Sequence, residues 1–474
     1  MSDPVAGRHV VVVGGGIAGL AAAAFLRAEA GPDLRVTVLE AADSIGGKLR
    51  LIEVAGLTLD GGAEALLARR PEAVDLLRRV GLGDDLVHPV TTAAGVWTRG
   101  MVRPLPRGHV FGIPTDLRAA ARGGVLSGRG LARAAAERLL PLRPTAHDIS
   151  VGQFVRDRWG AEVLDRLVDP LIGGVYAGRA DELSLDAVVP PLATAFHDGR
   201  RLAPPESAAK AGPVFAGIRG GVGRLPAAVA AASAAEVRTG VTVRQLQRLP
   251  EGWRLATGSA AAPEAILADA VVLALPACVS ARLLADVLPV AAGELATIEQ
   301  ASVAIVTLVL PTSAVRRPLR GSGFLVPAVD RRLIKAVTYS SAKWDWTDRA
   351  AGGALVLRAS VGRLGETAEL AHDDAELTRL VRADLERATG LRGEPAGSAV
   401  TRWGGALPQY AVGHLERVAR VRAAVASVPG LAVCGAAYDG IGIAACIASA
   451  RQAAAAVLGA APTGAELASA EGTP

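Results

Sequence analysis

The chain has 474 residues, of which 51% are hydrophobic and 3% aromatic, and its formal net charge is +5. This length predicts more than one domain, and the hydrophobic content is sufficient for a large core. The scarce aromatic residues, without basic–aromatic interleaving, argue against nucleic-acid binding. No apolar run reaches the length of about 18 residues that spans a membrane, and no signal peptide precedes the first predicted strand, so we expect a cytoplasmic protein.

Cysteine and histidine spacing gives no sign of a metal centre. Cys278, Cys434 and Cys446 form no CxxC pair, and the seven histidines show no HxxH or HExxH spacing. We therefore expect buried, reduced thiols, with neither a disulfide framework nor a bound metal.

A strand, a glycine-rich turn and a helix follow one another at the start of the chain. Residues 10–13 are four valines, typical of a strand buried on both faces, and a helical pattern covers residues 20–27. In the Gly-Gly-Gly-Ile-Ala-Gly turn between them, Gly14 allows the bend, Gly16 lets the backbone approach a pyrophosphate, and Gly19 permits close packing of helix and strand. The free N–H groups at the helix start favour phosphates, so we predict a dinucleotide site.

The next segment indicates which dinucleotide. A second strand over residues 36–39 ends in Glu40, whose carboxylate suits ribose hydroxyls. Gly46-Gly47 followed by the cation Lys48 resembles the second glycine motif of the flavin amine oxidase and protoporphyrinogen oxidase superfamily, which implies FAD; an ordinary surface turn is the alternative.

Two groups of arginines are candidates for binding an anionic substrate. Arg69 and Arg70 precede a predicted helix, and solvated arginines at a helix start are the alternative interpretation. Residues 99–143 contain nine arginines against only Asp116 and Glu137. This second group predicts a surface for anionic lipid or a wall that receives carboxylates, and a solvated helical face is the alternative.

A glycine pair marks the central region. Ser150 reads as a helix cap, and the Gly-Gly-Val-Tyr-Ala-Gly run from Gly173 follows a helical stretch that we expect the glycines to stop. Residues 153–184 resemble the protoporphyrinogen and coproporphyrinogen oxidases of haem biosynthesis, in which a similar turn lines the tetrapyrrole cavity. The resemblance extends over nearly the whole chain and implies substrate contacts from Gly173, Gly174 and Tyr176.

The remaining segments are interpreted with the same resemblance. Residues 241–243 are expected to form a strand whose Val243 touches the cofactor, and residues 270–276 are another buried strand. Residues 321–327 resemble a loop that packs on the substrate through Gly323 and Phe324, with a simple turn as the alternative. Strand patterns over 303–310, 335–339 and 354–360 and a long helix over 374–389 predict a second domain. At the C-terminal end, residues 431–443 repeat the order of strand, small-residue turn and helix.

Together these features predict an α/β fold: a discontinuous FAD-binding Rossmann-like domain, a mixed α+β substrate domain and a helical excursion. The expected segments are residues 1–90, 209–284 and 400–460 for FAD binding, 91–208 for the helical part, 285–399 for the substrate domain, and 461–474 as a disordered tail. The predicted cofactor-binding residues are Gly14, Gly15, Gly16, Ile17, Ala18, Gly19, Glu40, Ala41, Gly47, Lys48, Gly62, Ala63, Glu64, Val243, Trp403, Gly435, Ile441, Gly442 and Ile443. The predicted substrate-binding residues are Arg69, Arg70, Gly173, Gly174, Tyr176, Gly323 and Phe324.

The resemblance implies oxygen-dependent oxidation of coproporphyrinogen III to coproporphyrin III, with release of hydrogen peroxide and with a ferrochelatase as a downstream partner. Oxidation of protoporphyrinogen IX, another flavin amine oxidase-type desaturation, and flavin or tetrapyrrole binding without turnover remain alternatives. Peripheral contact with a membrane stays open, and no catalytic base is recognisable. The sequence departs from common family members at Lys48, where arginine is frequent, and across residues 60–64.

Overall fold

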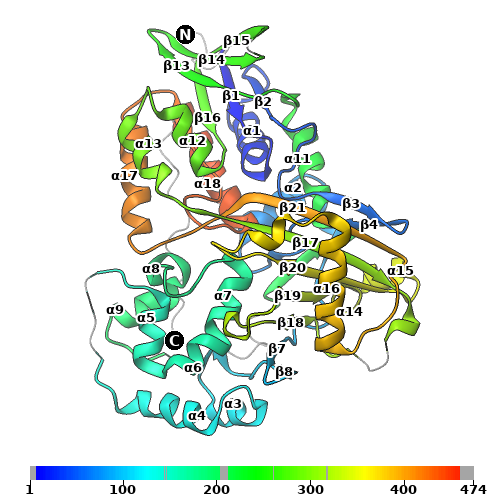
Figure 1. Ribbon diagram of the computed structural model, residues 1–474. Helices are drawn as coiled ribbons and strands as arrows, with labels where there is room; N and C mark the ends of the chain where they lie inside the picture. Colours follow the sequence, from blue (N-terminus) through cyan, green and yellow to red (C-terminus); the bar gives the residue numbers. More distant parts are fainter. Residues whose placement is uncertain are drawn as a thin grey trace.

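A five-stranded parallel sheet gathers strands from three distant parts of the chain (Figure 1). The computed structural model describes residues 7–142, 145, 147–202, 212–259, 261–315 and 319–459. The sheet runs in the order β12 (Glu236–Arg238), β2 (Arg35–Leu39), β1 (His9–Val13), β16 (Ala270–Leu273) and β22 (Leu431–Val433). The valines of β1 pair in register with β2 on one side and β16 on the other, and Val10, Val11 and Val12 are fully buried, as the continuous apolar run predicts.

Both faces of this sheet are covered. One face packs under α1 (Ile17–Ala30), α2 (Pro71–Arg79), α11 (Leu225–Ser233) and α18 (Ile443–Leu458). The other face packs against α12 (Ala277–Leu284), α13 (Pro289–Ala296), α17 (His414–Ala426) and the hairpin sheet of β13 (Gln245–Leu249), β14 (Gly252–Gly258) and β15 (Pro263–Ala268). The predicted α/β class is confirmed.

A second, seven-stranded sheet forms the other half of the molecule. Its order is β21 (Gly397–Pro408), β17 (Gln300–Leu310), β20 (Leu355–Val361), β19 (Ile334–Tyr339), β18 (Gly323–Leu325), β7 (Gly95–Thr98) and β8 (Met101–Pro104). Its apolar face packs on α16 (Asp374–Thr389), the long helix that the sequence predicts with the same bounds. Smaller pieces flank it: β3 (Leu51–Val54), β4 (Leu57–Asp60), β5 (Leu66–Leu67), β6 (Leu86–Val87), β11 (Phe215–Ile218), α14 (Ser340–Lys343) and α15 (Asp345–Ala351).

A helical lobe occupies the lower left of Figure 1. It contains α3 (Leu117–Gly123), α4 (Gly128–Ala135), α5 (Val151–Trp159), α6 (Ala161–Val163), α7 (Asp169–Tyr176), α8 (Leu185–Val188), α9 (Pro190–His197) and the short pair β9 (His109–Val110) and β10 (Ile113–Pro114). Ser150 caps α5 as expected, because its Oγ accepts the Gln153 N–H at 3.0 Å. A π-helical turn, η3 (Leu164–Val168), leads into α7; the 3-10 turns are η1 (Gly83–Asp85), η2 (Ala136–Leu139), η4 (Val222–Arg224), η5 (Thr312–Ala314), η6 (Ala328–Asp330) and η7 (Ala368–Ala371).

Five expectations differ from the structure. Cys278 is exposed, whereas the sequence predicts three buried thiols; Cys434 and Cys446 are buried. Residues 241–243 are not a strand, because the chain joins the parallel sheet earlier, at β12. Gly173 and Gly174 do not stop a helix: α7 continues to Tyr176 and ends where Ala177 adopts a left-handed conformation. Residues 95–104 and 400–408, assigned to other segments, are strands of the seven-stranded sheet, since pairing between distant strands leaves no local signal. Residues 321–327 contain the strand β18 rather than only a loop. The predicted tail, residues 461–474, lies outside the described residues.

Candidate active site

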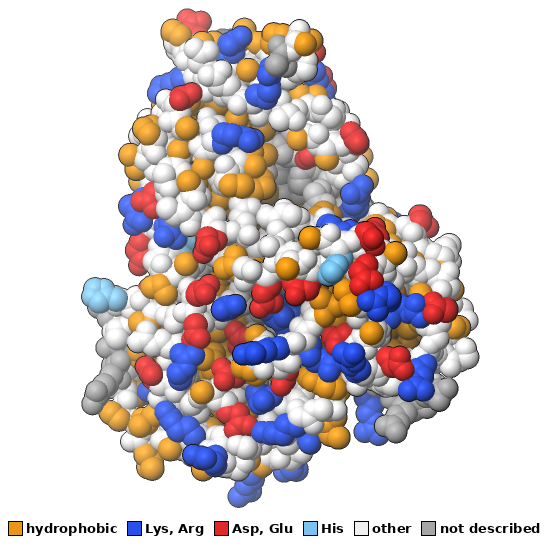
Figure 2. Space-filling view, in the orientation of Figure 1, with side chains coloured by type: hydrophobic (Ala, Val, Ile, Leu, Met, Phe, Trp, Pro, Cys, Tyr) orange, Lys and Arg blue, Asp and Glu red, His pale blue; other side chains and the backbone are white. Residues whose placement is uncertain are grey.

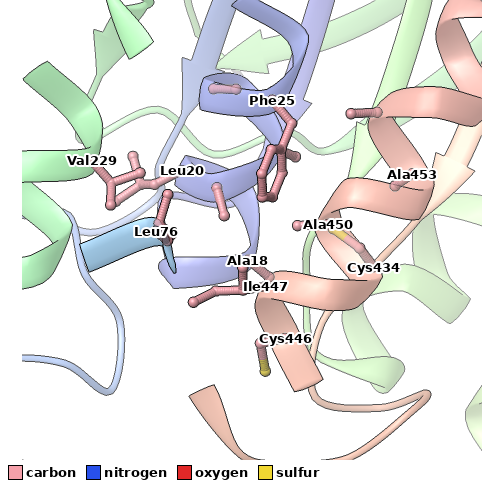
Figure 3. Packing of buried hydrophobic residues seen from close by; sticks show 14 of the residues in the cluster. Ala18, Leu20, Phe25, Leu76, Val229, Cys434, Cys446, Ile447, Ala450 and Ala453 are labelled. Carbon is pink, nitrogen blue, oxygen red and sulfur yellow. The ribbon is translucent and has the colours of Figure 1, made fainter. Parts of the chain in front are cut away.

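Two helices begin at the same end of the parallel sheet, and each begins at a glycine. Gly16 is the N-cap of α1 and Gly442 is the N-cap of α18. The helices pack through Ala18, Ile443 and Ile447, and Figure 3 shows Ala18 beside Ile447 where the two meet. A Cβ built at Gly16 or at Gly442 would meet nothing within 4 Å, so both backbones are open to a ligand. The two helix starts therefore present free N–H groups and positive dipole ends to the same region.

The glycine turn leaves its backbone open to a pyrophosphate at Gly16, whereas Gly14 and Gly19 are required for close packing. A Cβ at Gly19 would lie 1.9 Å from the Gly14 carbonyl oxygen, and Gly14 itself has a φ of +110°. Neither position tolerates a side chain. The Gly46–Gly47 pair lies against this turn, because the Gly46 N–H donates to the Gly15 carbonyl at 2.8 Å. The two predicted glycine motifs, residues 14–19 and residues 46–47, are therefore in direct contact.

Glu40 lies at the end of β2, beside the same turn. Its Oε2 accepts the Gly15 N–H at 2.7 Å, and its Oε1 accepts the Ala42 N–H at 2.8 Å. These bonds fix the carboxylate at the edge of the turn, with acceptor capacity left for ribose hydroxyls. Ala41 is exposed next to it, and the segment of Val243 adjoins Glu40, because the Val241 N–H donates to the Glu40 carbonyl at 2.9 Å; Val243 itself is 5% exposed.

Lys48, Gly62 and Trp403 meet where the hairpin of β3 and β4 adjoins β21. The Lys48 Nζ donates to the Ala406 carbonyl at 2.6 Å, and burial lowers the pKa of this amine. A Cβ at Gly62 would lie 1.9 Å from the Lys48 carbonyl oxygen and 3.2 Å from the Trp403 ring. The Trp403 Nε1 donates to the Gly61 carbonyl at 3.2 Å, and the Ala63 N–H donates to Lys48. The structure thus brings these predicted residues together.

Glu64 differs from the other predicted cofactor residues, because protein groups occupy its carboxylate. Oε1 accepts Lys343 Nζ at 2.8 Å, and Oε2 accepts Arg358 Nη1 at 2.7 Å and Ser340 Oγ at 2.9 Å. The two cations outweigh burial and hold the pKa of Glu64 well below its usual range. This ion-pair network joins the segment after β4 to α14 and β20, so the Glu64 side chain anchors the half that contains the five-stranded sheet to the half that contains the seven-stranded sheet.

The strand β22, the turn after it and α18 repeat the arrangement of β1, the glycine turn and α1. Gly435, at the end of β22, has a φ of +119°, and its N–H donates to the Ser449 Oγ at 3.0 Å. Tyr410 fixes the following turn, since its hydroxyl donates to the Ala436 carbonyl at 2.7 Å and accepts the Gly440 N–H at 2.8 Å. The loop containing Ile441 is thereby held at the start of α18.

The helix α7 presents its glycine face to β18. Gly174 and Val175 are exposed, and a Cβ at Gly174 would lie 3.3 Å from a Leu325 methyl. Tyr176 is buried, which raises the pKa of its hydroxyl to about 12, and its ring centroid lies 5.6 Å from that of Tyr410. The Tyr176 carbonyl accepts Gln409 Nε2 at 2.8 Å, so α7 is hydrogen-bonded to the residue that follows β21, the strand that contains Trp403.

Phe324 does not face α7. Its ring is 2% exposed and packs beside Tyr339 in the core under α16, because neighbouring residues of a strand point to opposite faces. Leu325, which the sequence analysis missed, is the β18 residue that faces Gly174. Gly323 has a packing role, since a Cβ there would lie 1.9 Å from the Val337 carbonyl oxygen.

The predicted arginines are largely engaged by the protein itself. Arg70 pairs with Glu72 at 2.7 Å beside the start of α2, and Arg69 donates to the Gly212 carbonyl at 2.8 Å. Arg99 pairs with Glu162 at 2.5 Å, and Arg133 donates to the Arg158 carbonyl at 2.7 Å. These contacts favour the helix-start interpretation for Arg70 and show that Arg69, Arg99 and Arg133 have partners within the protein. Figure 2 shows the basic side chains of the lower lobe interspersed with acidic ones.

The fold and these contacts define an oxidoreductase-type dinucleotide site next to a second, sheet-based domain. The sequence model of the family of flavin containing amine oxidoreductases matches residues 17–458. The chain therefore belongs to this family, and the predicted flavin cofactor is confirmed. The chain is 36% identical over 95% of its length to a coproporphyrinogen III oxidase of Mycobacterium tuberculosis, covering 97% of that protein. It is 32% identical over 93% of its length to one of Bacillus subtilis, covering 96% of it.

A solved structure from Exiguobacterium, described as a candidate protoporphyrinogen oxidase, superposes with a TM-score of 0.84 at 33% identity, covering 96% of this chain and 99% of that one. Within the described residues, no helix is both long and apolar enough to cross a membrane.

Proposed function

We propose that this protein is an FAD-dependent oxidase that converts coproporphyrinogen III to coproporphyrin III in haem biosynthesis, with dioxygen as the electron acceptor. The observation that carries the proposal is the 36% identity, along nearly the whole chain, to a protein named for that reaction. The geometry supports it, because the residues that fit a dinucleotide and the exposed glycine face of α7 are linked through Gln409 and Trp403.

The chain would hold FAD through the turn at Gly16, the Glu40 carboxylate and the start of α18. When bound, FAD supplies a two-electron oxidant that accepts hydride from the substrate. The N–H groups and the positive dipole end at Gly442 favour negative charge on whatever part of a ligand lies next to them. Complete aromatisation removes six hydrogens from the macrocycle, so three dioxygen molecules become three molecules of hydrogen peroxide.

The tetrapyrrole would lie against α7. Gly174 has no side chain to obstruct a flat ring, and Val175 and Leu325 offer apolar contact. No side chain is assigned as a base, and binding and orientation of the macrocycle are the contribution we propose for the protein. Oxidation of protoporphyrinogen IX is the second candidate, since the Exiguobacterium structure is described by that activity.

Location and partners follow from the proposed reaction. We expect the protein to act in the cytoplasm, to use dioxygen, and to release a porphyrin that a ferrochelatase can accept. The basic residues of α3 and α4 are the surface to test for peripheral contact with anionic lipid.

A charge placed on α7 tests the proposed function. Val175 is 55% exposed beside Gly174, and Val290 is 65% exposed on α13. In Val175→Asp a carboxylate would face the anionic substrate, so we expect oxygen uptake with coproporphyrinogen III to fall at least about tenfold. Val290→Asp should match the unmodified protein. No porphyrin formation by the flavin-loaded unmodified protein, or equal rates for both variants, would contradict the proposal.

A further inference from the structure

Lys335 is a buried cation that the features described so far leave unexplained. It lies in β19 of the seven-stranded sheet and is 4% exposed. Within the described part of the chain, its ammonium group has no hydrogen-bond or ion-pair partner. Lysines that are buried to this extent are normally paired, because an unpaired buried charge is costly.

The direction of the Lys335 side chain follows from a bulge in β19. The pairing of β19 with β20 shifts between Ile334 and Ala336. Ile334 and Val337 both pack in the core under α16, which leaves Lys335 and Ala336 on the opposite face of the sheet. Ala336 is the register partner of Leu325, the residue that faces Gly174 of α7. Lys335 therefore lies on the α7 side of the sheet.

A second cation adjoins Lys335. Arg363, 7% exposed, donates to the Val326 carbonyl at 3.1 Å, and the Val326 N–H donates to the Lys335 carbonyl at 2.8 Å. Burial lowers the pKa of Lys335 to about 7, and the positive charge of Arg363 acts in the same direction. Glu366 opposes this shift, but its carboxylate is 3.4 Å from Arg363 and 3.8 Å from Arg179, and it does not reach Lys335 within 4 Å.

The turn that carries Arg363 also contacts the candidate site. The Leu364 N–H donates to the Ala177 carbonyl at the end of α7 at 2.7 Å, and Leu364 packs with Trp403 and Ala177. Asp169, another acid near this turn, accepts the Ala180 N–H at 3.0 Å and interacts with the charge of Arg363. Glu366 and Asp169 therefore act mainly on Arg363, and no described carboxylate lies within 4 Å of the Lys335 ammonium group, next to the face of α7 assigned to the substrate.

We propose that Lys335, with Arg363 beside it, binds one carboxylate of the tetrapyrrole substrate and so contributes to specificity for acidic porphyrinogens. This inference rests on the proposed function and deepens it. A carboxylate would supply the partner that the ammonium group lacks, in a site of low dielectric where such a pair is strong. The inference assigns a binding role to the side chain and no step of the oxidation.

The test compares Lys335→Met with the unmodified protein, using coproporphyrin III and its tetramethyl ester as probes at equal detergent concentration. Binding is read by porphyrin fluorescence, which does not require turnover. Loss of one charge-assisted contact should weaken binding of the free acid about 10- to 100-fold and leave binding of the uncharged ester within about twofold. With coproporphyrinogen III, KM should rise by the same factor while kcat changes little.

Arg331→Gln is the control, because Arg331 is an exposed cation on the turn before β19 and should leave both affinities unchanged. Equal binding of the free acid by Lys335→Met and the unmodified protein would overturn the inference, as would equal weakening of acid and ester. Either result leaves the proposed function intact if the unmodified protein oxidises coproporphyrinogen III. Failure of the flavin-loaded unmodified protein to bind or oxidise any porphyrin probe would instead overturn the proposed function itself.

Discussion

Replacing Glu64 by glutamine should destabilise the protein far more than removing a comparable surface carboxylate. The Glu64 side chain is 11% exposed, and its partners Arg358 and Lys343 are 8% and 16% exposed. Glu64→Gln keeps the shape and one acceptor oxygen but removes the negative charge that both buried cations contact directly. Breaking a buried pair in this way costs about 3–5 kcal/mol.

Urea unfolding followed by circular dichroism measures the loss, because urea, unlike guanidinium, does not screen the ion pairs. Glu72→Gln is the matched control: Glu72 also pairs with an arginine, Arg70, but at the surface, where such a pair contributes less than about 1 kcal/mol. Release of flavin during unfolding provides a second measure of stability, since Glu64 joins the half that contains the five-stranded sheet to the half that contains the seven-stranded sheet.

The free energy of unfolding lost in Glu64→Gln should depend on pH. Because the pKa of Glu64 is lowered by folding, its stabilising contribution is present above the ordinary glutamate value of 4.5 and is lost as pH falls further. The difference between Glu64→Gln and the unmodified protein should therefore be largest at neutral pH and shrink in acid. Equal losses for Glu64→Gln and Glu72→Gln at neutral pH would refute the reasoning.

Three further predictions concern single side chains. Gly19→Ala places a Cβ 1.9 Å from the Gly14 carbonyl, so the purified protein should lose most of its visible flavin absorbance, whereas Gly293→Ala, with nothing within 4 Å, should retain it; equal flavin content in both would count against the glycine-turn site. Gly62→Ala should also lower flavin retention, measured by ultrafiltration, because its Cβ would displace the Lys48 carbonyl; unchanged retention would show that this contact is dispensable. Lys335→Met should stabilise the protein by up to about 5 kcal/mol in urea unfolding below pH 7, a gain that fades toward pH 10.5 because the lysine of the unfolded chain then loses its proton too; a pH-independent difference would contradict the pKa of about 7.

The dinucleotide half was predictable because its signals are local. A buried run of valines, glycines at fixed offsets and a carboxylate at the end of the next strand each have one physical reason to occur in that order. The structure places Gly16 and Gly442 at helix starts and Glu40 beside the glycine turn. The helix over Asp374–Thr389 was predicted with the same bounds.

The substrate side was less predictable because its residues meet only through long-range pairing. Phe324 was named from the family resemblance, and Leu325 was missed because the sequence does not reveal which face of β18 is buried. Lys335 was overlooked because a lysine in a strand pattern ordinarily marks the solvent side, and the bulge that turns it inward has no sequence signature here. Likewise, Glu64 could not be recognised as an ion-pair anchor, since Lys343 and Arg358 are nearly 300 residues away.

The most direct test of the central claim is a parallel assay of the flavin-loaded protein with coproporphyrinogen III and protoporphyrinogen IX, recording porphyrin fluorescence and oxygen consumption together. We expect a clearly higher kcat/KM for coproporphyrinogen III, with about three dioxygen molecules consumed for each porphyrin formed. A preference for protoporphyrinogen IX, or no porphyrin formation above the spontaneous rate with either substrate, would contradict the account.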